Sequence, residues 1–392
     1  MKWEKVLLGE VTDSCLGKML DQEKNRGEYQ PYLANVDVRW GSFNLDDLSE
    51  MRFEKDEQER YGLKYGDLVV CEGGEPGRCA IWKNQIPNMK IQKALHRVRV
   101  HDCLDYRYLY YWFLLAGKTG GLEQYFTGAT IKHMPGQKLK SVVIDKPPIG
   151  IQRSIADVLS SYDDLIENNQ KQIKLLEEAA QRLYKEWFVD LRFPGHENTK
   201  IIDGVPEGWS VQSINDIAEY INGYAFKPSD WGNLGKPIIK IKEMGSGIAS
   251  DTPRNPGESI PERYNVTAGD ILFSWSATLS AKIWDEEDGL LNQHLFKVIP
   301  HGGVSREFVL QSILKTLDEF SNLTTGSTMK HIQRGKLKEV HIIVPNEQMM
   351  HIYESISEPS REQILKLKKR IVILQEARDR LLPKLMSGEI EV

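Results

Sequence analysis

The chain has 392 residues, of which 40% are hydrophobic and 27% are charged, and its formal net charge at pH 7 is −5. This length exceeds one ordinary hydrophobic core and predicts two or three domains, and the composition is that of a globular protein rather than a disordered one. The negative net charge argues against a protein that coats nucleic acid regardless of sequence.

Signals for export are missing from the sequence. No run approaches about 18 uninterrupted apolar residues, so we expect no transmembrane helix. The start MKWEKVLLGEVTD has no long apolar segment and no small-residue cleavage site, so we expect no secretion. The four cysteines, Cys15, Cys71, Cys79 and Cys103, all lie in the first half. We therefore expect reduced thiols, a cytoplasmic location and no metal site.

Matching segments occur in the same order in both halves. TGATIKHMPGQKLK (127–140) and TGSTMKHIQRGKLK (325–338) share eight of fourteen residues. YGLKYGDLVV (61–70) likewise resembles YNVTAGDILF (264–273), and LHRV from Leu95 resembles LFKV from Leu295. The separation between matches falls from 206 to 198 residues along the chain. We infer a tandem duplication with short insertions in loops.

A heptad pattern follows each Thr-Gly segment, after a short apolar run that we expect to form a strand. Apolar residues alternate at spacings of four and three, which predicts a coiled-coil helix roughly 50 Å long. Pro359 predicts that the second helix starts or bends later than the first. We expect the two helices to pack antiparallel on each other; the alternative is that each packs on its own domain. The predicted seam residues are Ile166, Asn169, Ile173, Leu176, Leu183, Ile364, Leu367, Ile371, Leu374 and Leu381.

Charge is segregated onto the second helical segment. Residues 361–384 hold eight Lys or Arg against three acids, although the whole chain is acidic.

Asn169 is polar on the otherwise apolar seam of the first helix, where it could fix the register of the helices or lie at a wet edge.

The remaining segments predict mixed α/β domains (α+β). Short runs such as 66–70, 95–100, 269–273 and 295–299 are β-type, and residues 106–117 and 306–317 predict one helix in each copy. The predicted organisation is a domain at 1–148, a helix at 149–190, a second domain at 191–345 and a helix with a tail at 346–392.

We find no catalytic constellation that recurs in both halves. The sequence has no phosphate-binding loop of the Walker type, and KPPIG at Lys146 lacks the acceptor side chain that an aminomethyltransferase motif needs. The Thr-Gly-x-Thr-x-Lys-His segment instead offers hydroxyls, a glycine and a cation, which suit nucleic-acid phosphates. The alternative is a tight turn whose threonines satisfy neighbouring backbone. The candidate residues are Thr127, Gly128, Thr130, Lys132, His133, Thr325, Gly326, Thr328, Lys330 and His331.

Other polar segments differ between the two halves. CEGGEPGRC follows one Gly-Asp strand and SWSATLSAK follows the other, and the segments before Leu95 and Leu295 also diverge. A shared scaffold with different polar tips is what a protein that recognises two different base sequences needs. Taken singly, each of these residues is more often an ordinary loop or turn residue than a base contact. The candidates for base contacts are Arg78, Lys90, Gln92, Lys93, Trp275, Asn292, Gln293 and His294.

Taken together, these features resemble the specificity subunit of a Type I restriction–modification system. The resemblance covers the whole chain and rests on the two TGxTxKH segments, EWFVDLRFPG (186–195), VPEGW (205–209) and LLPKLMSGEI (381–390). It implies that each α/β domain is a target recognition domain for one half of a split DNA sequence. The helices would set the spacer between the halves, and the SGEIEV tail would lead back to the first domain.

The resemblance also implies partners. Two modification subunits would bind S-adenosylmethionine and methylate adenine N6, and restriction subunits would use ATP and Mg. This chain would have no catalytic residues and no cofactor of its own. Two alternatives remain open: a coiled-coil adaptor that links two protein-binding domains, and an enzyme with fused specificity domains.

Overall fold

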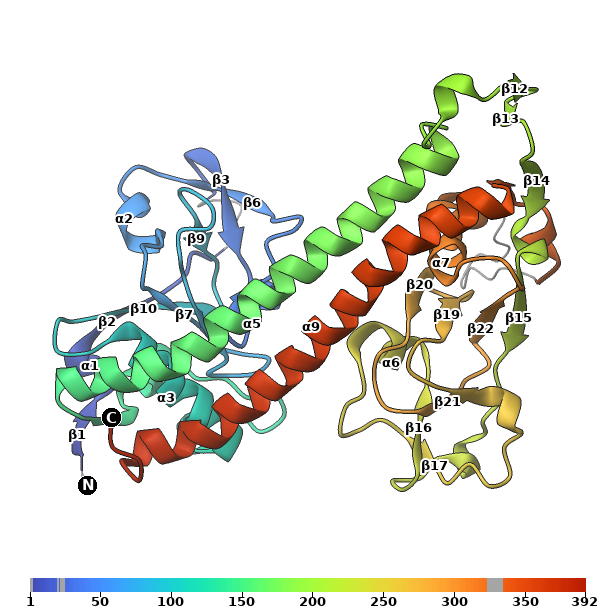
Figure 1. Cartoon of the computed structure of the whole chain (residues 1–392). Coiled ribbons are helices and arrows are strands. Elements are labelled where there is room, and N and C mark those ends of the chain that lie inside the picture. Colours follow the sequence, from blue (N-terminus) through green and yellow to red (C-terminus); the bar gives the residue numbers. More distant parts are fainter. Residues whose placement is uncertain (1–2, 20, 22–24, 323–333) are drawn as a thin grey trace. The chain divides into compact units, whose positions relative to one another are not determined.

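The computed structural model describes residues 3–19, 21, 25–322 and 334–392. The chain divides into two compact units: Met1–Asn168 with Ile371–Val392, and Asn169–Arg370. Each unit therefore contains one mixed α/β domain together with parts of both long helices, α5 (Ile149–Tyr184) and α9 (Glu347–Ser387) (Figure 1).

The first unit is built on a four-stranded antiparallel sheet in the order β2-β10-β7-β8. These strands are Thr12–Leu16, Leu95–Val100, Leu68–Cys71 and Cys79–Ile81. A second sheet has the order β6-β3-β9 (Glu50–Phe53, Glu28–Leu33, Lys90–Ile91), and its β3 and β9 are parallel. Strand β1 (Glu4–Leu7) pairs with β11 (Val143–Lys146), and this pairing brings the start of the domain to its last strand.

Smaller elements connect these strands in the first unit. They are the helices α1 (Leu8–Val11), α2 (Glu57–Tyr61) and α4 (Gly136–Lys140) and the hairpin of β4 (Val38–Arg39) with β5 (Ser42–Phe43).

Helix α3 (Tyr106–Thr119) joins the first domain to the long helices. Its N-terminus is capped by Asp105, whose carboxylate accepts from the backbone N–H groups of residues 107 and 108, and Gly120 ends it at φ 74°. Its buried face, which includes Leu109 and Phe113, lies in one hydrophobic cluster with residues of both long helices. The helix residues of this cluster are Ile155 and Leu159 of α5 and Leu382, Leu385 and Met386 of α9.

The second unit repeats the order of the main sheet and has one strand more in its second sheet. Its main sheet has the order β15-β22-β19-β20, with strands Ala218–Asn222, Leu295–Pro300, Ile271–Ser274 and Ser280–Ile283. Its second sheet has the order β17-β16-β21-β18 (Arg254–Asn255, Lys236–Ile239, Gly289–Leu291, Asn265–Val266), and β16 and β21 are parallel. Strand β14 (Ser210–Ser213) pairs with β23 (His341–Val344). The helices are α6 (Ile241–Ser246), α7 (Arg306–Lys315) and α8 (Leu317–Asn322), and β12 (Ile201–Ile202) and β13 (Val205–Pro206) form a hairpin.

The duplication extends to individual hydrogen bonds. Gly17 N donates to Leu95 O at 2.9 Å, and Gly223 N donates to Leu295 O at 3.1 Å. Trp82 N donates to Asp67 O, and in the same way Trp284 N donates to Asp270 O. The predicted tandem duplication is therefore confirmed, as are the predicted helices α3 and α7 and the strands at 95–100 and 295–299.

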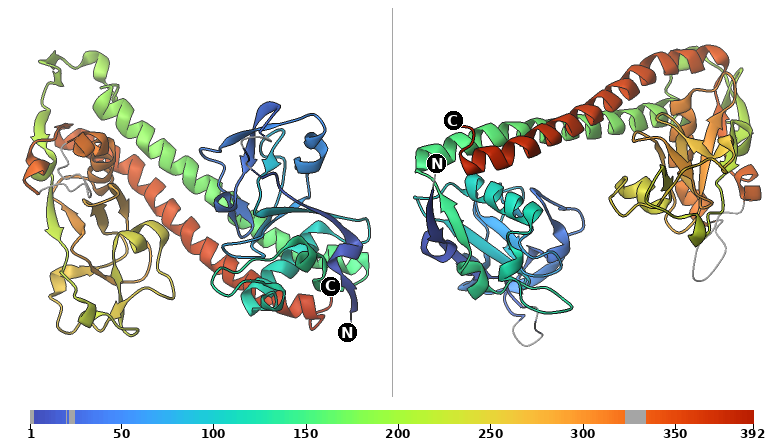
Figure 2. Two further views of the ribbon diagram at one scale, coloured as in Figure 1. Left: turned by 180° about the vertical axis from the view of Figure 1, so that it is seen from behind. Right: turned by 90° about the horizontal axis from the view of Figure 1, so that it is seen from below.

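The long helices are α5 (Ile149–Tyr184, 36 residues), which continues as a π-helical turn at Lys185–Val189, and α9 (Glu347–Ser387, 41 residues). In the first unit the start of α5 and the end of α9 share a core. In the second unit Trp187 and Phe188, which follow α5, contact the Tyr353 ring near the start of α9. The helices therefore pack together with antiparallel directions, as expected (Figures 1 and 2).

Of the two expectations drawn from Pro359, a late start of the second helix is wrong, and a bend in it stays a prediction. Helix α9 begins at Glu347 and continues through Pro359. One proline removes a single backbone donor at a cost of about 3 kcal/mol. Burial of Tyr353 before it and of Ile364 and Leu367 after it stabilises helix on both sides.

None of the predicted seam residues is exposed. Ile166, Asn169, Ile173, Ile364 and Leu367 are buried, and Leu176, Leu183, Ile371, Leu374 and Leu381 are half-buried. That they form one continuous heptad seam stays a prediction.

The tail of the chain returns to the first domain, as the resemblance implied. Trp3 Nε1 donates to the carbonyl of Met386, near the end of α9, at 3.1 Å. In the tail itself, a Cβ at Gly388 would lie 2.8 Å from the Trp3 ring. In the part of the chain that the structure describes, no helix is both long and apolar enough to cross a membrane.

The backbone passes close to Gly17 and to Gly223, so a side chain at either position should destabilise its domain. A Cβ at Gly17 would lie 2.4 Å from Gln92 O, and one at Gly223 would lie 2.1 Å from Asn292 O. We expect Gly17→Ala and Gly223→Ala each to lower the free energy of unfolding by about 1–3 kcal/mol, measured by urea denaturation. The control is Gly245→Ala in α6, where nothing lies within 4 Å, and it should be neutral or mildly stabilising. Equal tolerance at all three sites would contradict the packing described.

Candidate nucleic-acid interface

Three segments of the first domain that the sequence nominated separately meet in space. They are the loop 72–78, the turn 92–94 and the hairpin 127–133, which we call the tip of the first domain. Met134 N donates to Glu72 O at 2.7 Å, and Gly73 forms a β-bridge with His133. Glu72 N in turn donates to Ala94 O at 2.8 Å. The backbone of one loop therefore holds the other two segments beside it.

Asn35 and Arg78 stabilise this tip through side chains. Asn35 Nδ2 donates to Gly73 O at 2.8 Å and, more weakly, to Ala94 O at 3.4 Å. Arg78 donates to Asn35 O and Asn35 Oδ1, both at 3.1 Å, and pairs with Glu75 at 3.1 Å. Only 16% of the Arg78 side chain is exposed. In this conformation Arg78 orders the loop, and a base contact would require it to release these partners.

All residues of the hairpin are exposed, and some of them also form its turn. Thr127 and His133 exchange both backbone hydrogen bonds, at 2.7 and 2.9 Å, and Thr127 Oγ1 also donates to His133 O. Gly128 has φ 92°, and a Cβ there would lie 2.2 Å from Ile131 O. These residues form the turn itself. The side chains of Thr130, Ile131 and Lys132 project into solvent.

Lys132 carries the accessible cation of the hairpin. Its Nζ lies 3.8 Å from Glu123 Oε1 and 5.9 Å from the Phe126 ring, and 54% of the side chain is exposed. An exposed ion pair of this length contributes about 0–1 kcal/mol. The ammonium can therefore leave Glu123 for a phosphate at little cost.

The residues before Leu95 separate into accessible and buried ones. Lys93 is exposed and Gln92 is half-buried, so both can reach a ligand. Lys90 is only 3% exposed, its Nζ donates to Asn88 O at 2.9 Å, and burial lowers the pKa of its ammonium. We therefore leave Lys90 out of the proposed interface.

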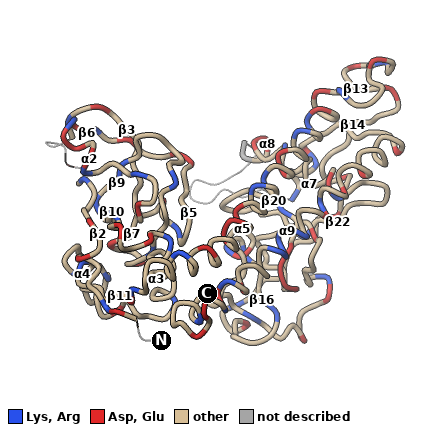
Figure 3. Tube along the Cα trace, turned by 60° about the vertical axis from the view of Figure 1, so that its left-hand side comes forward, with Lys and Arg blue, Asp and Glu red and all other residues tan. Residues whose placement is uncertain are grey.

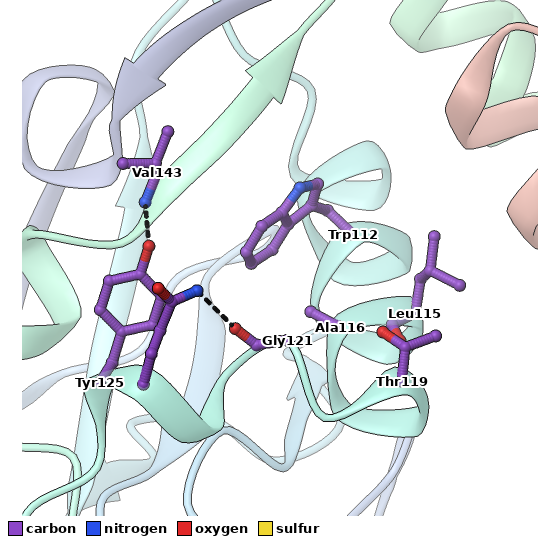
Figure 4. Close-up of a pocket in the computed structure, with 8 residues that line it drawn as sticks. Trp112, Leu115, Ala116, Thr119, Gly121, Tyr125 and Val143 are labelled. Atoms are coloured by element: carbon purple, nitrogen blue, oxygen red, sulfur yellow. Dashed lines mark hydrogen bonds between the residues drawn. The ribbon is translucent and has the colours of Figure 1, made fainter.

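Two cavities lie near this tip. One of about 470 Å³ is bounded by Trp40, by the loop residues 74–76 and by the hairpin residues 130–132, with Glu75 and Glu123 as its carboxylates. A smaller one of about 210 Å³ lies beside α3 (Figure 4). In it, Tyr125 Oη accepts from Val143 N at 3.1 Å, next to Trp112. None of the nominated residues lines the smaller cavity.

In the second domain the described part of the tip is formed by the turn 292–294 and Trp275. The Trp275 and His294 rings are 6.0 Å apart, and Gln293 is half-buried. Asn292 is 5% exposed, and its Oδ1 accepts from His294 N at 3.4 Å, so it shapes the turn. The other nominated residues, Thr325, Gly326, Thr328, Lys330 and His331, lie outside the described residues.

Sequence reasoning missed two residues that position the tip of the first domain. Asn35 joins two of its segments, and His96 is buried with Nε2 3.1 Å from Met134 O, directly after the hairpin. Burial lowers the pKa of His96, so its ring is neutral at pH 7. Comparison of the two halves could not find Asn35 and His96, because neither is repeated. Ile241 stands at the position of Asn35, and Phe296 stands at the position of His96.

Across the described residues, no three His, Cys, Asp or Glu side chains gather as metal ligands. The four cysteines are free thiols, and burial raises the pKa of Cys71 to about 11. Such a thiol is protonated and unreactive at neutral pH.

Comparisons with known proteins agree with this architecture. The family model described as the Type I restriction modification DNA specificity domain matches residues 1–178 and again 206–370. The specificity subunit of the type I restriction enzyme MjaIX of Methanocaldococcus jannaschii is 26% identical over 83% of this chain and 78% of its own length. The HindI specificity subunit of Haemophilus influenzae is 21% identical over 99% of both chains. The crystal structure of an S subunit from M. genitalium matches with a TM-score of 0.57 at 17% identity, over 98% of this chain and 96% of that one.

The fold and the repeated domain define a DNA specificity protein. The chain belongs to the family of type I restriction–modification specificity subunits. In that enzyme complex the specificity subunit is not the catalytic component.

The contrast between Lys132 and Lys90 gives a test of the interface. Lys132→Ala should weaken DNA binding by the complex for all sequences alike and reduce the salt dependence by about one phosphate contact. Lys90→Met, at a buried position, should leave both unchanged. Affinity is measured by fluorescence anisotropy across a salt series, with cognate and unrelated duplexes. A changed base preference in Lys132→Ala would show instead that this residue contacts bases.

Proposed function

We propose that each α/β domain recognises one half of a bipartite DNA target and that its tip makes the contacts. The observation that carries the proposal is a shared turn with different side chains. Lys93 N donates to Lys18 O, and Gln293 N donates to Tyr224 O, so the two turns have the same backbone register. Their sequences are nevertheless Gln-Lys-Ala at 92–94 and Asn-Gln-His at 292–294. One scaffold with two sets of donors and acceptors suits two different half-sites.

The long helices would set the spacer between these half-sites. A helix of 36 residues, as α5 is, spans about 54 Å at 1.5 Å per residue. Half-sites on one face of B-DNA are about 34–36 Å apart, one helical turn. Two domains attached near opposite ends of such helices can be held at that separation.

The same role implies partner subunits. A subunit that supplies specificity and not catalysis needs a methyltransferase, so we propose that two modification subunits join it, one for each repeated unit. They would carry S-adenosylmethionine and methylate adenine N6, and restriction subunits would carry ATP and Mg. The complex would act on DNA in the cytoplasm. Because the chain is acidic overall, much of the phosphate affinity would come from these partners.

The test is to purify the chain with its modification subunit and to map adenine methylation across a genome. We expect a motif of two half-sites with a fixed gap. Lys93→Ala should alter or abolish only the half recognised by the first domain, and Gln293→Ala, at the equivalent turn position, only the other half. Loss of both halves from either substitution would contradict independent recognition. A stable, active complex with no bipartite motif would favour the adaptor alternative.

The spacer role has its own test. Deleting one heptad from each of α5 and α9 shortens each helix by about 10 Å, which is about three base pairs. We expect the tolerated gap to shorten while both half-sites stay the same, measured with duplexes of graded spacer length. An unchanged gap in a folded variant would remove the helices as its determinant.

A further inference from the structure

Ion pairs connect each recognition domain to the long helices, and their polarity is opposite in the two units. Five such pairs are formed by the described residues. In the first unit every domain-side partner is basic and every helix-side partner is acidic. In the second unit the domain-side partners are acidic and those on α9 are basic. Figure 3 marks Lys and Arg, and Asp and Glu, along the chain.

In the first unit three basic side chains of the domain pair with the helices. Lys83 Nζ lies 2.9 Å from Glu167 of α5, and Arg107 Nη1 lies 2.6 Å from Asp157 of the same helix. Lys118 pairs with Asp379 of α9. These pairs are partly exposed, with 42% of the Lys83 side chain and 44% of the Glu167 side chain accessible.

In the second unit the pairs are more buried. Arg361 of α9 donates through Nε to Glu307 at 2.9 Å, and the Glu307 side chain is 2% exposed. Lys368 of α9 lies 2.5 Å from Asp285, which is 9% exposed. The neighbouring Lys368 and Lys282 cations hold the pKa of Asp285 below its ordinary value, against the opposing effect of burial. Asp285 is therefore ionised at neutral pH.

The oppositely charged residues occupy equivalent positions. Lys83 and Asp285 each follow the repeated tryptophan that bonds to the Gly-Asp turn. Arg107 and Glu307 are each the second residue of the corresponding helices α3 and α7.

The long helices also carry opposite charges at one equivalent position. Gln152 N bonds to Pro148 O and Met350 N bonds to Asn346 O, an offset of 198 residues. This offset makes Asp163 of α5 equivalent to Arg361 of α9. Asp163 accepts from Tyr111 of α3 at 2.6 Å, whereas Arg361 donates to Glu307 of α7.

We propose that charge sign assigns each recognition domain to its own place on the helices. The backbone features that the two domains share, namely the main-sheet order and the hydrogen bonds given above, do not distinguish their places on α5 and α9. Placing the first domain where the second domain contacts α9 would bring Lys83 and Arg107 toward Lys368 and Arg361. The reverse exchange would oppose acidic residues, and like charges at such sites disfavour the wrong partner. The same repulsion between like charges would disfavour the wrong domain of a second copy of this chain.

The test compares neutral with reversed charges in the full chain. Glu167→Gln removes the charge that pairs with Lys83, whereas Glu167→Lys places a cation opposite Lys83, as Lys368 of α9 would be. We expect Glu167→Lys to speed amide hydrogen exchange in α3 by about two- to five-fold over Glu167→Gln, with α7 unchanged. Adding Lys83→Glu should restore the rate, and high salt should reduce the difference. Lys368→Glu against Lys368→Gln is the matched comparison in the second unit, with the effect confined to α7.

Glu362→Lys is the control for charge reversal, because Glu362 pairs only along α9, with Lys366 at 3.5 Å, among its ion pairs in the described structure. It should leave both α3 and α7 unchanged. Equal exchange for the Gln and Lys variants at 167, without restoration by Lys83→Glu, would overturn the proposal. The Glu167 pair is exposed enough that its variants will fold, so the outcome does not depend on the buried Arg361 pair.

Discussion

Burial of the apolar stripes of two long helices is the constraint on which the rest of this molecule depends. Neither α5 nor α9 could persist alone in water with such a stripe exposed. In the first unit Ile155 and Leu159 lie in one core with Leu382 and Leu385, beneath α3. In the second unit Tyr353 packs among the aromatic rings at the end of α5. Each recognition domain is thus anchored to the element proposed to set its spacing.

The tips show how one scaffold can carry different recognition surfaces. Backbone hydrogen bonds fix the turns at 92–94 and 292–294, so their side chains can change without altering the fold. Arg78 and Asn292 are partly committed to the turns themselves. Lys93, Lys132 and Gln293 remain accessible to different degrees. Under the proposed role of the tips, specificity would vary at a few exposed positions on a rigid base.

Sequence reasoning succeeded where a pattern repeats and failed where a contact depends on the third dimension. The duplication, the helices α3 and α7 and the helix pair were predictable, because periodicity and repetition report local structure directly. Burial of Lys90 was not, since a lysine in a short polar segment gives no sign that a parallel strand will cover it. Pro359 misled for a related reason: tertiary burial outweighed the local helix-breaking cost.

The sequence by itself determined the two repeated domains, the two long helices and the family, because each is encoded by local or recurrent patterns. Only the tertiary structure decided that the loop 72–78, the turn 92–94 and the hairpin 127–133 form one surface. It alone also paired Lys83 with Glu167 and Asp285 with Lys368. The physical reason is that these contacts join residues distant in sequence, whose charges acquire meaning only when folding brings them within a few ångströms.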